Sequence, residues 1–131
     1  MRSSRVLLAD DHPHLAAAIG EYVAEVFQLV GTVGDGDALL EAATTLRPDV
    51  IVADILMPGT DGLTAMKQIH RHLPQVRVIL LTNCGDAEVV RHALDAGASG
   101  FVLKVYAPTE LVHAIRTVVD GGIYVSSGLA V

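Results

Sequence analysis

Residues 50–62 read VIVADILMPGTDG, an apolar run that ends in a carboxylate and continues into turn residues. The first four residues are β-branched or small and show no polar alternation, which is typical of a strand buried on both faces. The dipeptides Pro58-Gly59 and Asp61-Gly62 then favour turns. A buried strand that leads through a polar loop into a helical stretch is the unit from which parallel α/β sheets are built.

The same unit recurs on both sides of this stretch. Strands are predicted over residues 5–9, 29–33, 50–53, 76–81 and 100–103, and helices over residues 13–26, 37–46, 63–72, 87–96 and 108–120. Because a helix joins each strand to the next, we expect parallel strands with right-handed crossovers. The predicted fold class is α/β, a (βα)5 three-layer sandwich with helices on both faces of the sheet.

Composition limits the classes of function. The chain has 131 residues, of which 51% are hydrophobic, so it fits one domain with a real core. Its formal net charge is −6 and its nine basic residues are scattered singly, which argues against a nucleic-acid surface. The apolar runs are too short for a membrane span or a signal peptide. The single cysteine suits a reducing compartment, and we therefore expect a cytoplasmic domain.

Polar residues follow four of the predicted strands. Asp10 and Asp11 follow the first strand, Asp54 the third, Thr82 the fourth and Lys104 the fifth. In open parallel sheets, sites form at the carboxyl ends of the strands. Three crowded carboxylates require a cation, and such oxygen ligands select Mg²⁺ or Mn²⁺. With an ammonium and a hydroxyl beside them, these groups could neutralise a phosphoryl group placed on a carboxylate oxygen.

Four segments resemble motifs of a known family. They are residues 6–13 (VLLADDHP), 54–62 (DILMPGTDG), 80–82 (LLT) and 96–104 (AGASGFVLK). In this order and spacing they resemble the motifs of bacterial response-regulator receiver domains, and the likeness covers essentially the whole chain. Any one motif would be weak, but four together are specific. The resemblance implies a flavodoxin-like fold with five parallel strands in the order 2-1-3-4-5 and five flanking helices.

The resemblance also implies a role for each candidate residue. Asp54 resembles the nucleophile that accepts a phosphoryl group from the phosphohistidine of a sensor histidine kinase. Asp11, Asp54 and the backbone carbonyl of Leu56 would coordinate Mg²⁺, while Asp10 would act partly through water. Lys104 would pair with the phosphoryl group. Such a domain is a switch and not a turnover enzyme, although it promotes its own phosphorylation and dephosphorylation.

Two further residues are implied to transmit the signal. Thr82 would move to bond a phosphoryl oxygen, and Phe101 would turn inward with it. This movement would change the surface of the fourth helix, the fifth strand and the fifth helix, where partners read the state. A phosphorylation-dependent homodimer is one outcome that the resemblance allows.

Other details resemble the NarL/FixJ (LuxR-type) subfamily of these regulators. They include Val105 in place of a proline after the lysine, and residues 121–126 (GGIYVS) after the last helix. Members of this subfamily normally carry a helix-turn-helix domain after a linker. We therefore predict a receiver domain over residues 1–121 and the start of a linker over residues 122–131. A transcriptional regulator would then contact DNA only through a C-terminal domain outside this chain, the alternative being a lone receiver.

Three positions depart from the family pattern. Asn83 follows the switch threonine, where a small residue is usual, and Cys84 comes next. Leu56, two residues after Asp54, offers no side chain to orient an attacking water. These departures predict an altered lifetime of the phosphoryl group, with slower hydrolysis favoured. They also leave open a degenerate receiver that acts as a phosphorylation-independent interaction module and binds Mg²⁺ poorly.

The histidines indicate no metal site by their spacing. His12 and His14, like His70 and His72, are two residues apart, which places the members of each pair on different sides of a helix. We therefore expect no histidine among the metal ligands.

Overall fold

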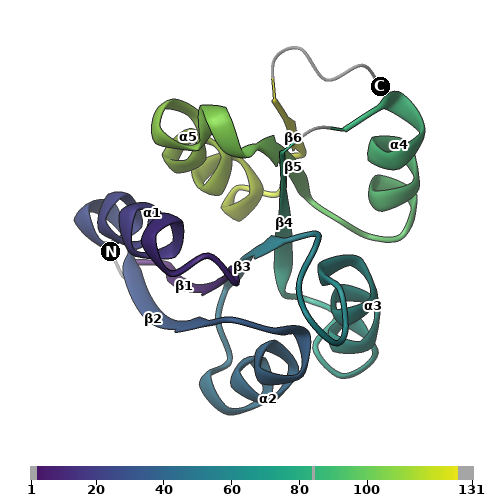
Figure 1. The fold of residues 1–131 in the computed structure, drawn as a ribbon, viewed down its shortest axis with the longest axis horizontal. Coiled ribbons are helices and arrows are strands. Elements are labelled where there is room, and N and C mark those ends of the chain that lie inside the picture. The colour runs from purple at the N-terminus through teal and green to yellow at the C-terminus, as the bar shows by residue number, and fades with distance from the viewer. Residues whose placement is uncertain (1–2, 84, 127–131) are drawn as a thin grey trace.

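The computed structural model describes residues 3–83 and 85–126 and shows a parallel sheet between two layers of helices (Figure 1). The strands are β1 (Arg5–Ala9), β2 (Gln28–Val33), β3 (Val50–Asp54), β4 (Arg77–Thr82), β5 (Gly100–Leu103) and β6 (Tyr124–Val125). The helices are α1 (Pro13–Val26), α2 (Gly36–Leu46), α3 (Gly62–His72), α4 (Ala87–Asp95) and α5 (Ala107–Val119), with a 3-10 turn over Lys104–Tyr106. The strand order is β2-β1-β3-β4-β5-β6. The predicted flavodoxin-like fold class is confirmed.

Helices cover both faces of this sheet, α1 and α5 on one and α2, α3 and α4 on the other (Figure 1). Neighbouring residues of a strand serve opposite faces, since successive side chains point to opposite sides. Leu7 and Ile51 belong to the core under α2, α3 and α4, whereas Leu8 and Val52 belong to the core under α1 and α5. All four side chains are fully buried. The absence of polar alternation in the strands follows from these two cores.

The helix starts carry local signals that the sequence shows directly. The carboxylates of Asp35, Asp61 and Asp86 each accept a hydrogen bond from a backbone amide three residues ahead, at 2.8–2.9 Å, and so cap α2, α3 and α4. Helices α1 and α5 instead carry Pro13 and Pro108 in the first turn, where proline fits without loss of a hydrogen bond. Each predicted helix and each of the five predicted strands agrees with the structure to within one residue at either end.

The structure adds one strand that the sequence did not predict. The two residues of β6, Tyr124–Val125, pair in parallel with β5. Ser126 follows and is buried; its hydroxyl accepts a hydrogen bond from the Leu103 amide at 3.0 Å and donates one to Glu110 at 2.7 Å. A two-residue strand is too short for a recognisable pattern. The segment predicted to begin a linker thus packs on the sheet as far as Ser126, while the boundary itself stays a prediction.

Within the part of the chain that the structure describes, no helix has the length and apolar character needed to cross a membrane.

Candidate functional site

The carboxyl ends of neighbouring strands bring the predicted site residues to one edge of the sheet. Asp10 follows β1, Asp54 ends β3, Thr82 ends β4 and Lys104 follows β5. Since β1 and β4 flank β3, Asp54 lies at the centre of this edge. None of the four residues is more than 7% exposed. Polar groups buried to this degree are costly unless they are paired, so their partners decide what the site can do.

Lys104 supplies the buried positive charge of the site. Its Nζ donates a hydrogen bond to Asp54 Oδ2 at 2.5 Å and lies 3.4 Å from Asp10 Oδ2. Burial alone would lower the pKa of Lys104, but the hydrogen bond to Asp54 and the charges of Asp10 and Asp54 outweigh it and hold that pKa above its usual value of 10.5. The lysine is therefore charged at neutral pH and balances one of the two buried carboxylates.

The Asp54 carboxylate is held by the loop that follows it. Its Oδ1 accepts a hydrogen bond from the Leu56 amide at 3.0 Å, while Oδ2 faces Lys104. The loop closes where the Gly62 amide donates to the Ile55 carbonyl at 3.0 Å. A Cβ atom on Gly62 would lie 2.3 Å from the backbone carbonyl oxygen of Asp54, so only glycine permits this approach. The start of α3 is therefore packed tightly against the end of β3.

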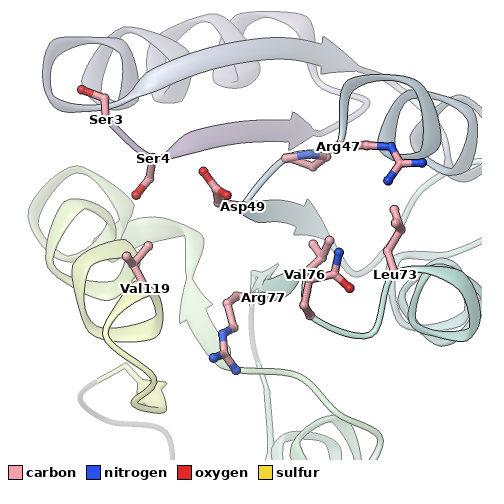
Figure 2. Close-up of a pocket in the computed structure, with 10 residues that line it drawn as sticks. Ser3, Ser4, Arg47, Asp49, Leu73, Val76, Arg77 and Val119 are labelled. Carbon is pink, nitrogen blue, oxygen red and sulfur yellow. The ribbon is translucent and has the colours of Figure 1, made fainter. Parts of the chain in front are cut away.

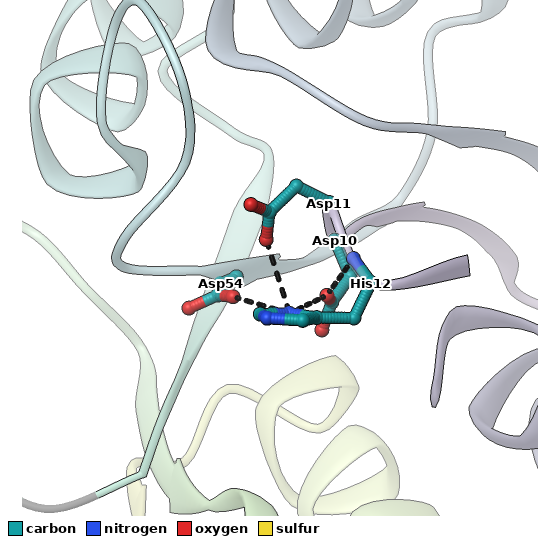
Figure 3. Close-up of side chains that lie close together, drawn as sticks. All are labelled: Asp10, Asp11, His12 and Asp54. Carbon is teal, nitrogen blue, oxygen red and sulfur yellow. Dashed lines mark hydrogen bonds and ion pairs between the residues drawn. The ribbon is translucent and has the colours of Figure 1, made fainter. Parts of the chain in front are cut away.

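Two more carboxylates and an imidazole meet in front of Asp54 (Figure 3). The Nδ1 atom of His12 lies 3.0 Å from Asp10 Oδ1, 3.1 Å from Asp11 Oδ1 and 3.9 Å from Asp54 Oδ2. One ligand atom from each of these four residues lies within 4.8 Å of all the others. We call Asp10, Asp11, His12 and Asp54 the acidic cluster. Its atoms are close enough to share one ion.

The acidic cluster has more acceptors than donors. Asp10 Oδ2 and Asp11 Oδ1 are buried and have no hydrogen-bond partner among the described residues, although Asp10 Oδ2 lies 3.4 Å from Lys104 Nζ and Asp11 Oδ1 lies 3.1 Å from His12 Nδ1. Buried carboxylate oxygens without donors are unfavourable unless a cation approaches them. Carboxylate oxygens are hard ligands of the kind that Mg²⁺ and Mn²⁺ prefer. The donor set therefore fits a divalent cation held by Asp10, Asp11 and Asp54.

His12 is the member of the cluster that sequence reasoning missed. The spacing of His12 and His14 predicts different sides of a helix, but His12 is the N-cap of α1, has an extended backbone and so precedes the helix. Its amide and its ring Nδ1 both meet Asp10 Oδ1, at 2.8 and 3.0 Å. The structure thus places His12 beside the predicted ligands, and the expectation that no histidine binds the metal stays a prediction at this point. Its position directly after two aspartates at a strand end was the signal that could have found it.

The remaining predicted residues lie at varied depths. Thr82 is buried at the end of β4, opposite Leu103 of β5. Phe101 is fully buried in the core on the α4 side of the sheet, and its movement on phosphorylation stays a prediction. The Leu56 residue is 72% exposed and presents no polar side chain to the site. Cys84 lies outside the described residues.

A hollow opens beside the acidic cluster. It has a volume of about 390 Å³ and is lined by His12, Pro13, His14, Leu15, Asn83 and Lys104. Asn83 and Lys104 therefore line the same space, and the effect of Asn83 on access to the site stays a prediction.

Comparison with known proteins decides the family. The chain matches the response regulator receiver domain over residues 6–116, which includes every residue of the site described above. The chain belongs to this family. The receiver domain resembles response regulator GacA of Pseudomonas viridiflava, with 36% identity over 128 residues, 96% of this chain and 60% of that protein. It resembles response regulator VraR of Staphylococcus epidermidis with 33% identity over 119 residues, 89% of this chain and 57% of that protein.

Solved structures agree with this assignment. The non-phosphorylated receiver domain of RcsB from Escherichia coli has a TM-score of 0.89 and 32% identity, over 96% of this chain and 100% of that chain. The signal receiver domain of the response regulator NarL from Mycobacterium tuberculosis has a TM-score of 0.87 and 32% identity, over 92% of this chain and 99% of that chain. The predicted NarL/FixJ type is confirmed. The receiver domain described here spans no more than 60% of the length of GacA or VraR.

Proposed function

We propose that this receiver domain is a phosphorylation-activated switch that accepts a phosphoryl group on Asp54 from a sensor histidine kinase. The observation that carries the proposal is the position of the Asp54 carboxylate, which is 3% exposed, bonded to Lys104 and surrounded by carboxylates that fit a divalent cation. A buried carboxylate with a fixed ammonium beside it is suited to charge-changing chemistry on its oxygens.

The transfer that we propose is a displacement at phosphorus. One Asp54 oxygen attacks the phosphorus atom of the kinase phosphohistidine, forming a P–O bond while the P–N bond breaks and its electron pair returns to the imidazole. The Nζ of Lys104 donates a hydrogen bond to Asp54 Oδ2, and from this position its charge can balance the growing negative charge of the phosphoryl oxygens. Mg²⁺, held by Asp10, Asp11, Asp54 and the Leu56 carbonyl, would supply further neutralisation of these oxygens.

The response to phosphorylation would pass through Thr82 and Phe101. Thr82 ends β4 and Phe101 lies in β5, and the two strands are paired. A hydroxyl that moves toward the phosphoryl group would shift the end of β4 relative to β5, and the α4, β5 and α5 surface would follow. A phosphorylation-dependent homodimer through such a surface is part of the proposal. The domain would act as a switch and not as a turnover enzyme.

We also propose that the parent protein regulates transcription in the cytoplasm. A relative with 33% identity is the transcriptional activator protein ExaE of Pseudomonas putida, and one similar solved structure is a complex of RcsB with DNA. The formal net charge of −6 disfavours DNA binding by the receiver domain itself. DNA contact would therefore come from a separate C-terminal domain.

Intact mass spectrometry tests the proposed chemistry. The protein is incubated with a small phosphodonor and Mg²⁺, beside Asp54→Asn and the matched control Asp61→Asn, whose aspartate caps α3 at the surface. One added phosphoryl group is expected on the wild type and on Asp61→Asn, and none on Asp54→Asn. No addition to the folded wild type would favour the alternative, a phosphorylation-independent interaction module.

A further inference from the structure

His12 is placed in the acidic cluster as a ligand would be. Around an ion with octahedral bonds of about 2.1 Å, neighbouring ligand atoms are about 3.0 Å apart and opposite ones about 4.2 Å. The His12 Nδ1 atom lies 3.0 and 3.1 Å from oxygens of Asp10 and Asp11, and 3.9 Å from one of Asp54. The distances from the imidazole nitrogen to the three carboxylate oxygens therefore match those between ligands around one ion.

The backbone fixes the residue that carries this ring. The His12 amide donates to Asp10 Oδ1 at 2.8 Å, and Pro13 follows in the first turn of α1. His12 has an extended backbone as the N-cap of α1, and its ring lies beside Asp10, the residue that follows β1. The ring is thus held at the cluster although its side chain is 61% exposed.

The second observation is the shortage of donors among the carboxylates. In the described part of the chain, Asp10 Oδ2 and Asp11 Oδ1 are buried without hydrogen-bond partners, and each has only one ion-pair contact, to Lys104 and His12 respectively. An ion that satisfies these oxygens lies within reach of the imidazole. Imidazole nitrogen binds Mn²⁺, Co²⁺ and later transition metals better than it binds Mg²⁺, which prefers oxygen.

We propose that His12 Nδ1 is a ligand of the divalent cation at this site and favours Mn²⁺ or Co²⁺ over Mg²⁺. The inference rests on the proposed function only in taking the acidic cluster as the cation site. If the His12 ring only donated a hydrogen bond to the carboxylates, a cation that bound there would displace it, because the Nδ1 proton would face the positive charge. A ligating histidine instead stays and presents its lone pair.

Pulsed electron paramagnetic resonance on the Mn²⁺-loaded chain, without a histidine tag, reads the ligand directly. We expect nitrogen coupling to the Mn²⁺ electron spin in the wild type and in the control His14→Gln. The coupling is lost in His12→Gln, which keeps the size of the side chain but offers oxygen, and in His12→Ala. Bound Mn²⁺ without nitrogen coupling in the wild type would overturn the proposal.

Metal titrations give the second reading. The ratio of the Mg²⁺ to the Mn²⁺ dissociation constant is expected to fall about tenfold in His12→Gln and to stay unchanged in His14→Gln. An unchanged ratio in His12→Gln would contradict the inference. Asp11→Asn should weaken the binding of both ions, which locates them at the cluster.

The two proposals fail in different ways. If Asp54 is phosphorylated but bound Mn²⁺ shows no nitrogen coupling, the inference on His12 is wrong and the proposed phosphorylation switch stands. Nitrogen coupling in a protein that takes up no phosphoryl group would support the inference and remove the switch. No binding of Mn²⁺ at all would remove the His12 ligand and the cation part of the proposed function.

Discussion

The acidic cluster lies at the carboxyl end of the sheet, and a second group of charged side chains lies at the amino end (Figure 2). There Arg47, Asp49 and Arg77 line a pocket of about 390 Å³. Charged side chains near this pocket form hydrogen bonds with backbone groups. The backbone amide of Arg5 donates to Asp49 Oδ2 at 2.8 Å, and the Arg5 guanidinium donates to the Leu46 carbonyl at 2.7 Å.

The difference between the two ends teaches how to recognise a functional charge. At the amino end, Asp49 and Arg5 complete the hydrogen bonds of backbone groups and so stabilise the start of β1. At the carboxyl end, carboxylates face one another and two buried oxygens have no hydrogen-bond partner in the described structure. Groups that repel in this way reduce stability and are retained for what they bind. Charge alone is therefore a poor marker of a site, whereas buried acceptors that lack donors are a good one.

The largest effect should come from removing the lysine at the carboxyl end. Lys104→Met leaves Asp10 and Asp54 buried without their counter-charge, and we expect it to lower the free energy of unfolding by about 3 kcal/mol without metal. Mg²⁺ should restore part of this loss, because the metal ligands remain. Urea unfolding with and without Mg²⁺ measures both, with the exposed Lys67→Met as control. We expect Lys104→Met to reduce phosphorylation more than it reduces the affinity for Mg²⁺. A loss of Mg²⁺ affinity as large as the loss of phosphorylation would contradict the proposed role of the lysine as a partner of the phosphoryl group.

The second prediction concerns the aspartate at the amino end. Asp49→Ala removes the acceptor of the Arg5 amide, and we expect a loss of about 2 kcal/mol in the free energy of unfolding. Added Mg²⁺ should not change this loss, since Asp49 lies at the far end of the strands. Stability that is unaffected by Asp49→Ala would remove the contrast between the two ends.

The matched substitution at the carboxyl end, Asp11→Ala, should change the free energy of unfolding in the opposite direction. Asp11→Ala relieves repulsion among the three carboxylates of the acidic cluster, and we expect this relief to outweigh the lost contact with His12 and to raise the free energy of unfolding by about 1 kcal/mol in metal-free buffer. The same variant should lose the stabilisation that Mg²⁺ gives to the wild type. A drop in metal-free stability would show that Asp11 has a structural role after all.

The smallest effect that we expect is a pH dependence of stability that comes from Tyr124 in β6, a residue that belongs to neither group of charges. Burial and the neighbouring Glu110 raise the pKa of Tyr124 above its usual value of 10.0. The folded state thus favours the protonated phenol, so this stabilisation is complete below pH 10 and is lost as pH rises through the folded pKa. The free energy of unfolding of the wild type should fall faster above pH 10 than that of Tyr124→Phe. Parallel curves for the two proteins would contradict this.

The sequence was sufficient for most of the fold because its signals are local. Apolar runs mark the strands that are buried on both faces, and Asp35, Asp61 and Asp86 mark helix starts by a hydrogen bond within one turn. The meeting of Asp54 with Lys104 could also be expected, since parallel strands align their carboxyl ends. The strand β6 could not, because two residues carry no period and its pairing depends on β5.

Most of the residues that meet at this edge of the sheet were predictable from the sequence, but His12 and the contacts between the residues were not. The inclusion of His12 depends on one backbone conformation, the extended N-cap of α1, which a helical period does not describe. The close packing of Gly62 on the Asp54 carbonyl depends on how α3 meets β3. Such features arise where two elements join, and a pattern read along one element does not contain them.

Strand β6 also governs how the edge of the sheet meets other protein molecules. An unpaired edge strand offers free amides and carbonyls on which a second chain can add a strand, which is a route to aggregation. Here the Tyr124 amide donates to the Ser99 carbonyl, the Ser126 amide to the Phe101 carbonyl, and the Leu103 amide to the Ser126 hydroxyl. These bonds occupy the outer edge of β5, and the two-residue β6 that replaces it is too short to be a good template. The segment therefore protects the domain against edge-to-edge aggregation on this side of the sheet.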